Sequence, residues 1–259
     1  MRKLFLFLVV LMVVIYARRV NATVYVSVDF EDGQIHNQDP PGYPNIVPPV
    51  VLTESGNHFL RLTASPQDCG PAFATTCPRT RSNVSMGHAA TAKSGLTVTY
   101  AWQMRIPKAT NPNGQNNLLF QLAQDTTAGF TWIGGKTAWI GSLNGRLFLR
   151  NDQTQTSRDL GPIPYDQWVS YSLAVFLTDN PALGRIDLTM NGAAVASIVG
   201  EATVIPAGVF GNTKSGADEW TQMHLQLVDF IGVFGTVDYD NVQISSVGAL
   251  GSITLKSVG

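Results

Sequence analysis

The chain has 259 residues and a formal net charge of −1, from 17 basic and 18 acidic groups, and only 14% of its residues are charged. This balance excludes a polybasic protein that binds nucleic acid through phosphate contacts, and it excludes an acidic disordered chain. Hydrophobic residues make up 44% of the chain, enough for a substantial core in one large domain or two small ones.

The N-terminus has the pattern of a secretory signal peptide. Residues 1–3 are a short basic start, and residues 4–17 form an uninterrupted apolar run of 14 residues. Val20 and Ala22 then fit a small-residue cleavage site. Arg18 and Arg19 favour a signal anchor instead, but the apolar run is shorter than the about 20 residues that a membrane span needs. We predict a signal peptide over residues 1–22, and hence an exported protein with no membrane association after cleavage.

Two cysteines agree with export. Cys69 and Cys77 lie eight positions apart in a proline-containing stretch. In an oxidising compartment such a pair is expected to form a disulfide that closes a loop. The alternative is two unpaired thiols. A redox-active motif is not expected, because the sequence has no C-x-x-C.

Short runs with period-two alternation and turn residues between them recur along the rest of the chain, and this pattern predicts β-strands. The expected strands are residues 24–30, 59–64, 96–106, 117–123, 137–140, 146–150, 168–177, 185–190, 194–199, 228–234 and 241–245. Asn144-Gly145 and Asn191-Gly192 each separate two apolar runs, as in tight hairpins. About a dozen short strands indicate an all-β sandwich or barrel.

The domain organisation is simple. No Pro/Ser-rich linker and no repeat of 20–50 residues divides the chain, so residues 23–246 are predicted as one domain and residues 247–259 as a flexible tail. Residues 215–226 are expected to hold one helical turn inside a long loop, with Glu219 near its start as a cap.

Acidic residues mark both ends of this domain. Asp29 and Glu31 end the first expected strand, and Asp240 opens the last one. First and last strands of a sandwich often lie side by side, so these hard oxygen ligands are expected to converge on a structural Ca²⁺. The alternative is that they are ordinary turn residues that cap strand ends.

Polar residues alternate along three expected strands. Gln103 and Arg105 share one side of their strand, Gln121 shares a side with its neighbours at 117, 119 and 123, and Asn83 follows Arg81 by two. Amide and guanidinium groups in a row on a sheet can hydrogen-bond the hydroxyls and carboxylates of a sugar polymer. The alternative is an ordinary solvated face of an antiparallel sheet.

Residues 81–124, which begin with RSNVSMGHAATAKSGLTVTYAWQMRIP, resemble the core of jelly-roll polysaccharide lyases. That family's pattern has an Arg-Ser-Glu-Leu strand, an aromatic strand ending in Ile-Pro, and a strand ending in Gln-x-His. The later order of Asn-Gly, Gln-Trp, Asn-Gly and Asp-Asn-Val segments is also similar, so the resemblance covers most of residues 24–246. It implies a concanavalin A-like, antiparallel two-sheet β-sandwich that acts on a polysaccharide.

The sequence departs from this pattern at the residues that matter most. Asn83 stands where the family has Glu, Ala123 stands where it has His, and residues 230–234 (FIGVF) lack its Tyr. The chain has four Glu residues, and none is paired with an acid at the spacing of a glycosidase signature. A retaining glycosidase with two carboxylates about 5 Å apart is therefore not expected.

A lyase that works by β-elimination must neutralise a uronate carboxylate, remove the proton on C5 and protonate the leaving oxygen. For the first role we predict Arg81 with Asn83 and Gln121, with Gln103 and Arg105 as further substrate-binding residues. His88 or His224 is the candidate base. The candidate acids are Tyr100, Tyr171 and Tyr239.

The sequence is compatible with three functions. The first, and the one we predict, is a secreted, monomeric, polysaccharide-active protein that cleaves uronate-containing glycans. The second is a non-catalytic, lectin-like carbohydrate-binding module, which the missing His and Tyr favour. The third is a surface protein that uses the sandwich as a scaffold, because a fold does not determine a function.

Overall fold

The structure is a computed structural model, and it describes residues 22–36, 48–64, 80–90, 97–111, 117–126, 132–204, 219–229 and 235–247. Residues 1–21 of the predicted signal peptide (1–22), both cysteines and all of the predicted tail except residue 247 lie outside these residues. In the described part, the only helix is the single turn η2 (Lys108–Thr110). No described helix has the length and apolar character that a membrane crossing requires.

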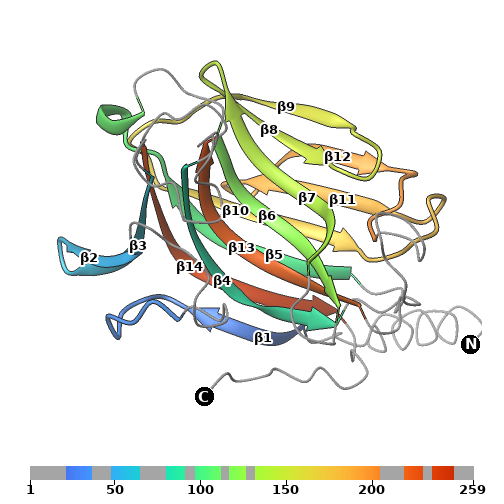
Figure 1. The fold of residues 1–259 in the computed structure, drawn as a ribbon, viewed down its shortest axis with the longest axis horizontal. Coiled ribbons are helices and arrows are strands. Elements are labelled where there is room, and N and C mark those ends of the chain that lie inside the picture. Colours follow the sequence, from blue (N-terminus) through green and yellow to red (C-terminus); the bar gives the residue numbers. More distant parts are fainter. Residues whose placement is uncertain are drawn as a thin grey trace, which may run out of the picture.

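Two antiparallel sheets form the fold (Figure 1). The larger sheet has eight strands in the order β12-β11-β10-β5-β14-β3-β2, with β1 also paired to β14. Its strands are β1 (Ala22–Val28), β2 (Val50–Glu54), β3 (Asn57–Ala64), β5 (Thr97–Arg105), β10 (Val169–Phe176), β11 (Arg185–Met190), β12 (Ala193–Val199) and β14 (Gly235–Val247).

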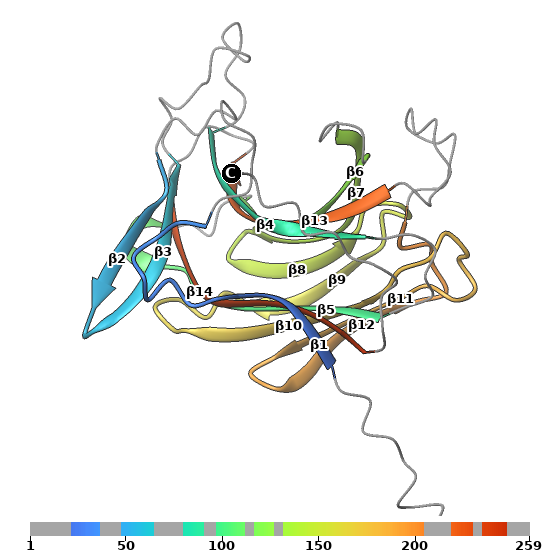
Figure 2. The same ribbon diagram turned by 90° about the horizontal axis from the view of Figure 1, so that it is seen from below.

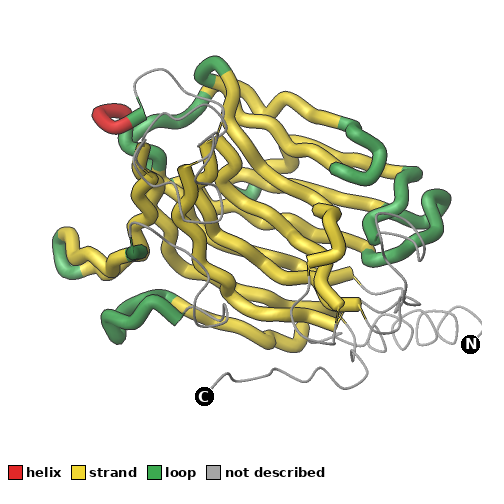
Figure 3. The backbone as a smooth tube through the Cα atoms, in the orientation of Figure 1, coloured by secondary structure: helices red, strands yellow, loops and turns green. Residues whose placement is uncertain are grey.

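The second sheet has six strands in the order β4-β13-β6-β7-β8-β9. Its strands are β4 (Thr80–Ala90), β6 (Asn117–Thr126), β7 (Trp132–Leu143), β8 (Arg146–Asn151), β9 (Ser157–Pro162) and β13 (Glu219–Asp229). Figure 2 shows the two sheets as stacked layers, and at one end β4 rises beside β3 of the eight-stranded sheet. Figure 3 shows how few of the described residues lie outside strands.

The core lies between the layers, where the inward side chains of both sheets meet. In β5, Val98, Tyr100, Trp102 and Met104 are all buried to 1% exposure or less, while the residues between them are partly exposed. The Trp102 ring stacks on Phe120 of the other sheet, with centroids 4.1 Å apart. The predicted all-β, two-sheet sandwich is therefore confirmed.

Both predicted hairpin turns are present. Asn144 and Gly145 join β7 to β8 with φ of 51° and 76°, and Asn191 and Gly192 join β11 to β12 with φ of 49° and 78°. Positive φ at both central residues is what a two-residue turn needs to match the twist of its strands.

One segment differs clearly from the prediction. The helical turn expected over residues 215–226 is wrong from Glu219 onward, because Glu219–Asp229 is strand β13, between β4 and β6. Its apolar residues Met223, Leu225 and Leu227 follow a period of two and enter the core.

The strand β6 contains a second difference. Alternation predicted Leu119 on the same side as Gln121, but Leu119 is in the core and Leu118 packs on Trp139 outside it. The pairing of β6 with β7 is irregular between Leu118 and Phe120. An extra residue in one strand reverses the side on which the following residues lie, which explains the error.

Candidate functional site

A row of directly opposed residues crosses the six-stranded sheet, and we call it the cross-sheet row. The strand registers connect it through β4, β13, β6, β7, β8 and β9: it consists of Ser85, His224, Gln121, Trp139, Arg150 and Ser157. Opposed residues of an antiparallel pair share a face. Core residues flank the row in the chain: Val84, Leu225, Leu122, Ile140 and Leu149. The first five members therefore lie on the outer face of this sheet.

His224, the second member of the row, forms a buried polar pair with Asn83, which lies two residues before Ser85 in β4. His224 is 5% exposed, Asn83 is fully buried, and the His224 Nδ1 lies 3.0 Å from the Asn83 Oδ1. An amide oxygen only accepts, so Nδ1 carries the hydrogen and donates it. In the neutral ring the lone pair is then on Nε2, which is the arrangement that a general base requires.

Gln121 and Gln226 form the next polar contact. The Gln226 Nε2 donates to the Gln121 Oε1 over 3.0 Å, between β13 and β6. The pairing of these strands is irregular between Leu225 and Val228, which is where Gln226 lies. The Gln121 amide nitrogen has two N–H groups, which are suitable donors to a carboxylate.

Aromatic side chains continue the face beyond Gln121. Trp139 and Phe148 meet edge to face, with centroids 5.3 Å apart, and Leu118 packs with them. The Trp139 indole N–H donates to the Asp152 carboxylate over 3.1 Å. The Arg150 guanidinium lies over the Trp139 ring, 5.5 Å from its centroid.

Two predicted catalytic residues are placed only by their backbone. Arg81 and His88 both lie in β4, with Arg81 opposite Val228 and His88 opposite Gln222 of β13. Their side chains are outside the description. Of the four predicted catalytic residues, the structure therefore places Gln121 and His224 together and leaves the roles of Arg81 and His88 as predictions.

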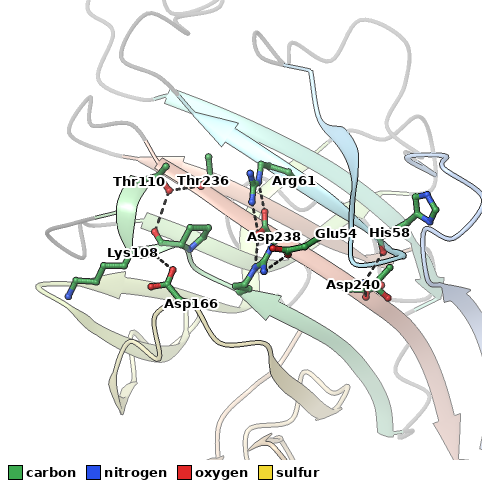
Figure 4. A network of polar contacts seen from close by, with 12 residues as sticks. Glu54, His58, Arg61, Lys108, Thr110, Asp166, Thr236, Asp238 and Asp240 are labelled. Atoms are coloured by element: carbon green, nitrogen blue, oxygen red, sulfur yellow. Dashed lines mark hydrogen bonds and ion pairs between the residues drawn. The ribbon is translucent and has the colours of Figure 1, made fainter.

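Gln103 and Arg105 lie on the other sheet, so the single substrate face that joined them to Asn83 and Gln121 does not exist. Both are in β5, where Gln103 accepts a hydrogen bond from the Asn241 side chain over 3.0 Å. Arg105 donates to Asp238 over 2.9 Å and to Glu54 over 2.6 Å. Figure 4 labels these two carboxylates, Asp238 and Glu54, which lie close together. Alternation within one strand does not tell which sheet the strand joins.

Asp238 is the main partner of the Arg105 guanidinium. Its carboxylate is fully buried and also accepts two hydrogen bonds from Arg61, over 2.6 and 2.8 Å. Arg105 further lies 4.9 Å from the ring centroid of Trp168. These bonds satisfy a buried charge, and they indicate a structural role for Arg105.

The predicted calcium ligands lie near one another, but protein groups already occupy their oxygens. Burial raises the pKa of Asp240, and the negative charges of Glu31 and Asp29 raise it further. The Glu31 carboxylate accepts from the His58 side chain and backbone N–H, both at 3.0 Å. Among the described residues, no group of three or more His, Cys, Asp or Glu is placed to hold a metal ion. The donors are of the type that calcium prefers, but an ion would have to draw them together.

The three candidate tyrosine acids are in the core rather than on the outer face. Tyr100 and Tyr239 are fully buried, and Tyr171 is 2% exposed. Burial raises the pKa of Tyr171 and raises that of Tyr239 well above its usual range. None of the three is therefore placed to protonate a leaving group on the surface.

The strand order and the two antiparallel sheets define a jelly-roll sandwich. The family model described as "Polysaccharide lyase" matches residues 29–216, and the chain belongs to this family. No protein of curated function matches the chain in sequence.

Solved structures share the fold at low sequence identity. An endo-β-1,4-glucuronan lyase from the fungus Trichoderma reesei superposes with a TM-score of 0.61 and 17% identity, covering 86% of this chain and 95% of that one. Alginate lyase A1-II′, of polysaccharide lyase family 7, gives 0.53 and 11%, covering 80% and 86%. Identities this low show a common fold and no more.

Sequence reasoning missed three members of this face: Gln226, Trp139 and Arg150. Gln226 was inside the segment expected to be helical, and Trp139 and Arg150 were treated as ordinary strand residues. Each lies directly before or after a core residue in its strand, but nothing in the sequence shows that these strands are neighbours. Only the register does so.

Proposed function

We propose that this protein cleaves a uronate-containing polysaccharide by β-elimination, with His224 as the group that transfers the proton. The observation that carries the proposal is the His224–Asn83 pair, which lies beside Gln121 on the outer face of the six-stranded sheet. Membership of the polysaccharide lyase family supports the reaction class. The fold shared with a glucuronan lyase favours an acidic glycan.

A small number of residues would carry out the β-elimination. Amide N–H groups of Gln121, joined by the predicted Arg81, would hydrogen-bond the uronate carboxylate and make the C5 proton more acidic. The Nε2 of His224 takes that proton, the electron pair forms the C4=C5 double bond, and the bond from C4 to the glycosidic oxygen breaks. Because the candidate tyrosines are in the core, we assign the return of the proton to the leaving oxygen to His224 as well.

The position of His224 accounts for a departure from the family pattern. The pattern's Gln-x-His would put the histidine at Ala123 of β6, but Ala123 is opposite Gln222 of β13. On β13 two residues further along, His224 is directly opposite Gln121. We infer that the neighbouring strand supplies the imidazole that β6 lacks.

The test is the release of unsaturated uronate from polyglucuronate, alginate, heparin and pectin, followed by its ultraviolet absorbance. We expect turnover of at least one polymer, and a decrease in kcat of about 100-fold or more in His224→Gln, the usual loss when a general base is removed. His58→Gln is the matched control, because His58 is on the other sheet and pairs with Glu31. Equal melting midpoints would show that both variants fold.

A lectin-like binding module is the second candidate function. Asn83 and Ala123, in the places of the family's Glu and His, favour it. It would be indicated by the absence of unsaturated product from every polymer, together with retardation of the protein in a polyuronate affinity gel. Full activity of His224→Gln would keep the lyase but remove His224 from the mechanism.

Export and calcium are also proposals. We propose that the protein acts outside the cell after loss of residues 1–22, and that Ca²⁺ is bound by Asp29, Glu31 and Asp240. Burial is the main cause of the raised pKa of Asp240, and the nearby negative charges of Glu31 and Asp29 add to it, so a cation there would be favourable. Calcium should then raise the melting midpoint relative to EDTA. The midpoint of Asp240→Asn should not respond, and an unresponsive wild type would exclude the site.

A further inference from the structure

We propose that Arg150 is a binding residue for a second uronate carboxylate, several sugar units from the bond that is cleaved. The inference rests on the proposed function and extends it to the length and charge of the substrate. It starts from the place of Arg150 in the cross-sheet row, on the same outer face as His224 and Gln121.

Arg150 differs from the other described arginines in how its guanidinium is bonded. Arg61, Arg105, Arg146 and Arg185 each donate to a carboxylate at 3.1 Å or less, and Arg158 donates to backbone carbonyls. Arg150 is 3.8 Å from the nearest carboxylate oxygen, that of Asp152, which is beyond hydrogen-bond distance. Within the described residues its buried Nε has no hydrogen-bond partner.

The surroundings hold this cation in position. Its guanidinium lies over the Trp139 ring, and Asp152 is itself bound by the Trp139 indole N–H. The Arg150 side chain is still 32% exposed. Because the Nε is buried, a carboxylate from outside would bind the two terminal Nη groups, and a guanidinium can hold a carboxylate there through two parallel hydrogen bonds.

The register gives the distance from the reaction site. Three strand spacings separate His224 from Arg150 along the row, through Gln121 and Trp139, which is about 14 Å at the usual spacing of strands. One unit of an extended 1,4-linked sugar chain advances by about one strand spacing. A polymer lying across the strands would therefore present the carboxylate of roughly the third unit to Arg150.

The experiment compares Arg150→Gln with the wild type on polyuronate and on purified oligouronates of increasing length. We expect KM to rise about tenfold on the polymer and on the longer oligomers, the usual effect of losing a charge-assisted hydrogen bond, with kcat nearly unchanged. The shortest cleavable oligomers should show no change, because they do not reach Arg150. Arg185→Gln is the matched control, since Arg185 pairs with Asp187 on the other sheet.

The outcomes separate this inference from the proposed function. If the wild type binds but does not cleave, the lyase proposal fails, and weaker retardation of Arg150→Gln in a polyuronate affinity gel still supports the binding role. If Arg150→Gln equals the wild type on every length and in the gel, the inference is wrong while the lyase stands. An equal rise in KM at all lengths would also overturn it, as would a wild type that neither binds nor cleaves.

Discussion

At the scale of single residues, Tyr239 connects the core to the candidate site. It belongs to β14 of the eight-stranded sheet, but its hydroxyl reaches across the core to the backbone carbonyls of Leu119 and Gln226 in the other sheet. Both carbonyls lie where the pairing of β6 and β13 is irregular. Buried carbonyls that lose ladder partners need another donor, and this hydroxyl supplies it beside the residues that hold Gln121 and Gln226.

Replacing Tyr239 by Phe removes that donor and leaves the ring in place. We expect the free energy of unfolding to decrease by about 1–3 kcal/mol, the cost of leaving buried polar groups unsatisfied. Urea denaturation measures it. Tyr25→Phe is the matched control, because the Tyr25 hydroxyl bonds a hydroxyl, that of Ser246, and no backbone carbonyl among the contacts described for it. An unchanged urea midpoint in Tyr239→Phe would show that the irregular strands do not depend on this hydroxyl.

At the scale of elements, the sequence predicts strands well where one face is apolar and the turn is short. The β7–β8 and β11–β12 hairpins are read directly from Asn-Gly turns. The strand β13 cannot be read from the sequence in this way. Its first residues, which include Glu219, Trp220 and Gln222, give no period-two signal before the buried residues begin. Membership of a central strand depends on neighbours that come from distant parts of the chain, β4 and β6.

For the candidate site too, the sequence predicts which residues of one strand share a side but not which strands are neighbours. Asn83, Gln121 and His224 were all proposed from the sequence, from their residue types and the family resemblance, and the register brings them together. Gln103 and Arg105 were proposed from the same alternation and lie on the other sheet. Alternation fixes which residues of one strand share a side, but it does not fix which strands lie side by side.

At the scale of the whole molecule, the two outer faces use their polar residues differently. On the eight-stranded sheet, the described charges are paired with each other, as in the bonds from Arg61 and Arg105 to Asp238. On the six-stranded sheet, Arg146 pairs with Asp159, but Arg150 lies over the Trp139 ring, and within the described residues its Nε has no hydrogen-bond partner. This difference at Arg150 is what supports the proposal that the outer face of the six-stranded sheet binds the polysaccharide.

The core that joins these faces should make the whole fold sensitive to alkali. Burial raises the pKa of both Tyr171 and Tyr239, so neither ionises in the folded protein near pH 10, where an exposed tyrosine does. Their contribution to stability is complete below the pKa of the unfolded chain and is lost as the pH rises above it. Each should lower the free energy of unfolding by about 1.4 kcal/mol per pH unit above roughly pH 10. Urea midpoints measured between neutral pH and this range should therefore decrease steeply, and Tyr239→Phe should show a shallower decrease than the wild type. Equal slopes would mean that Tyr239 ionises as readily in the folded protein as in the unfolded chain.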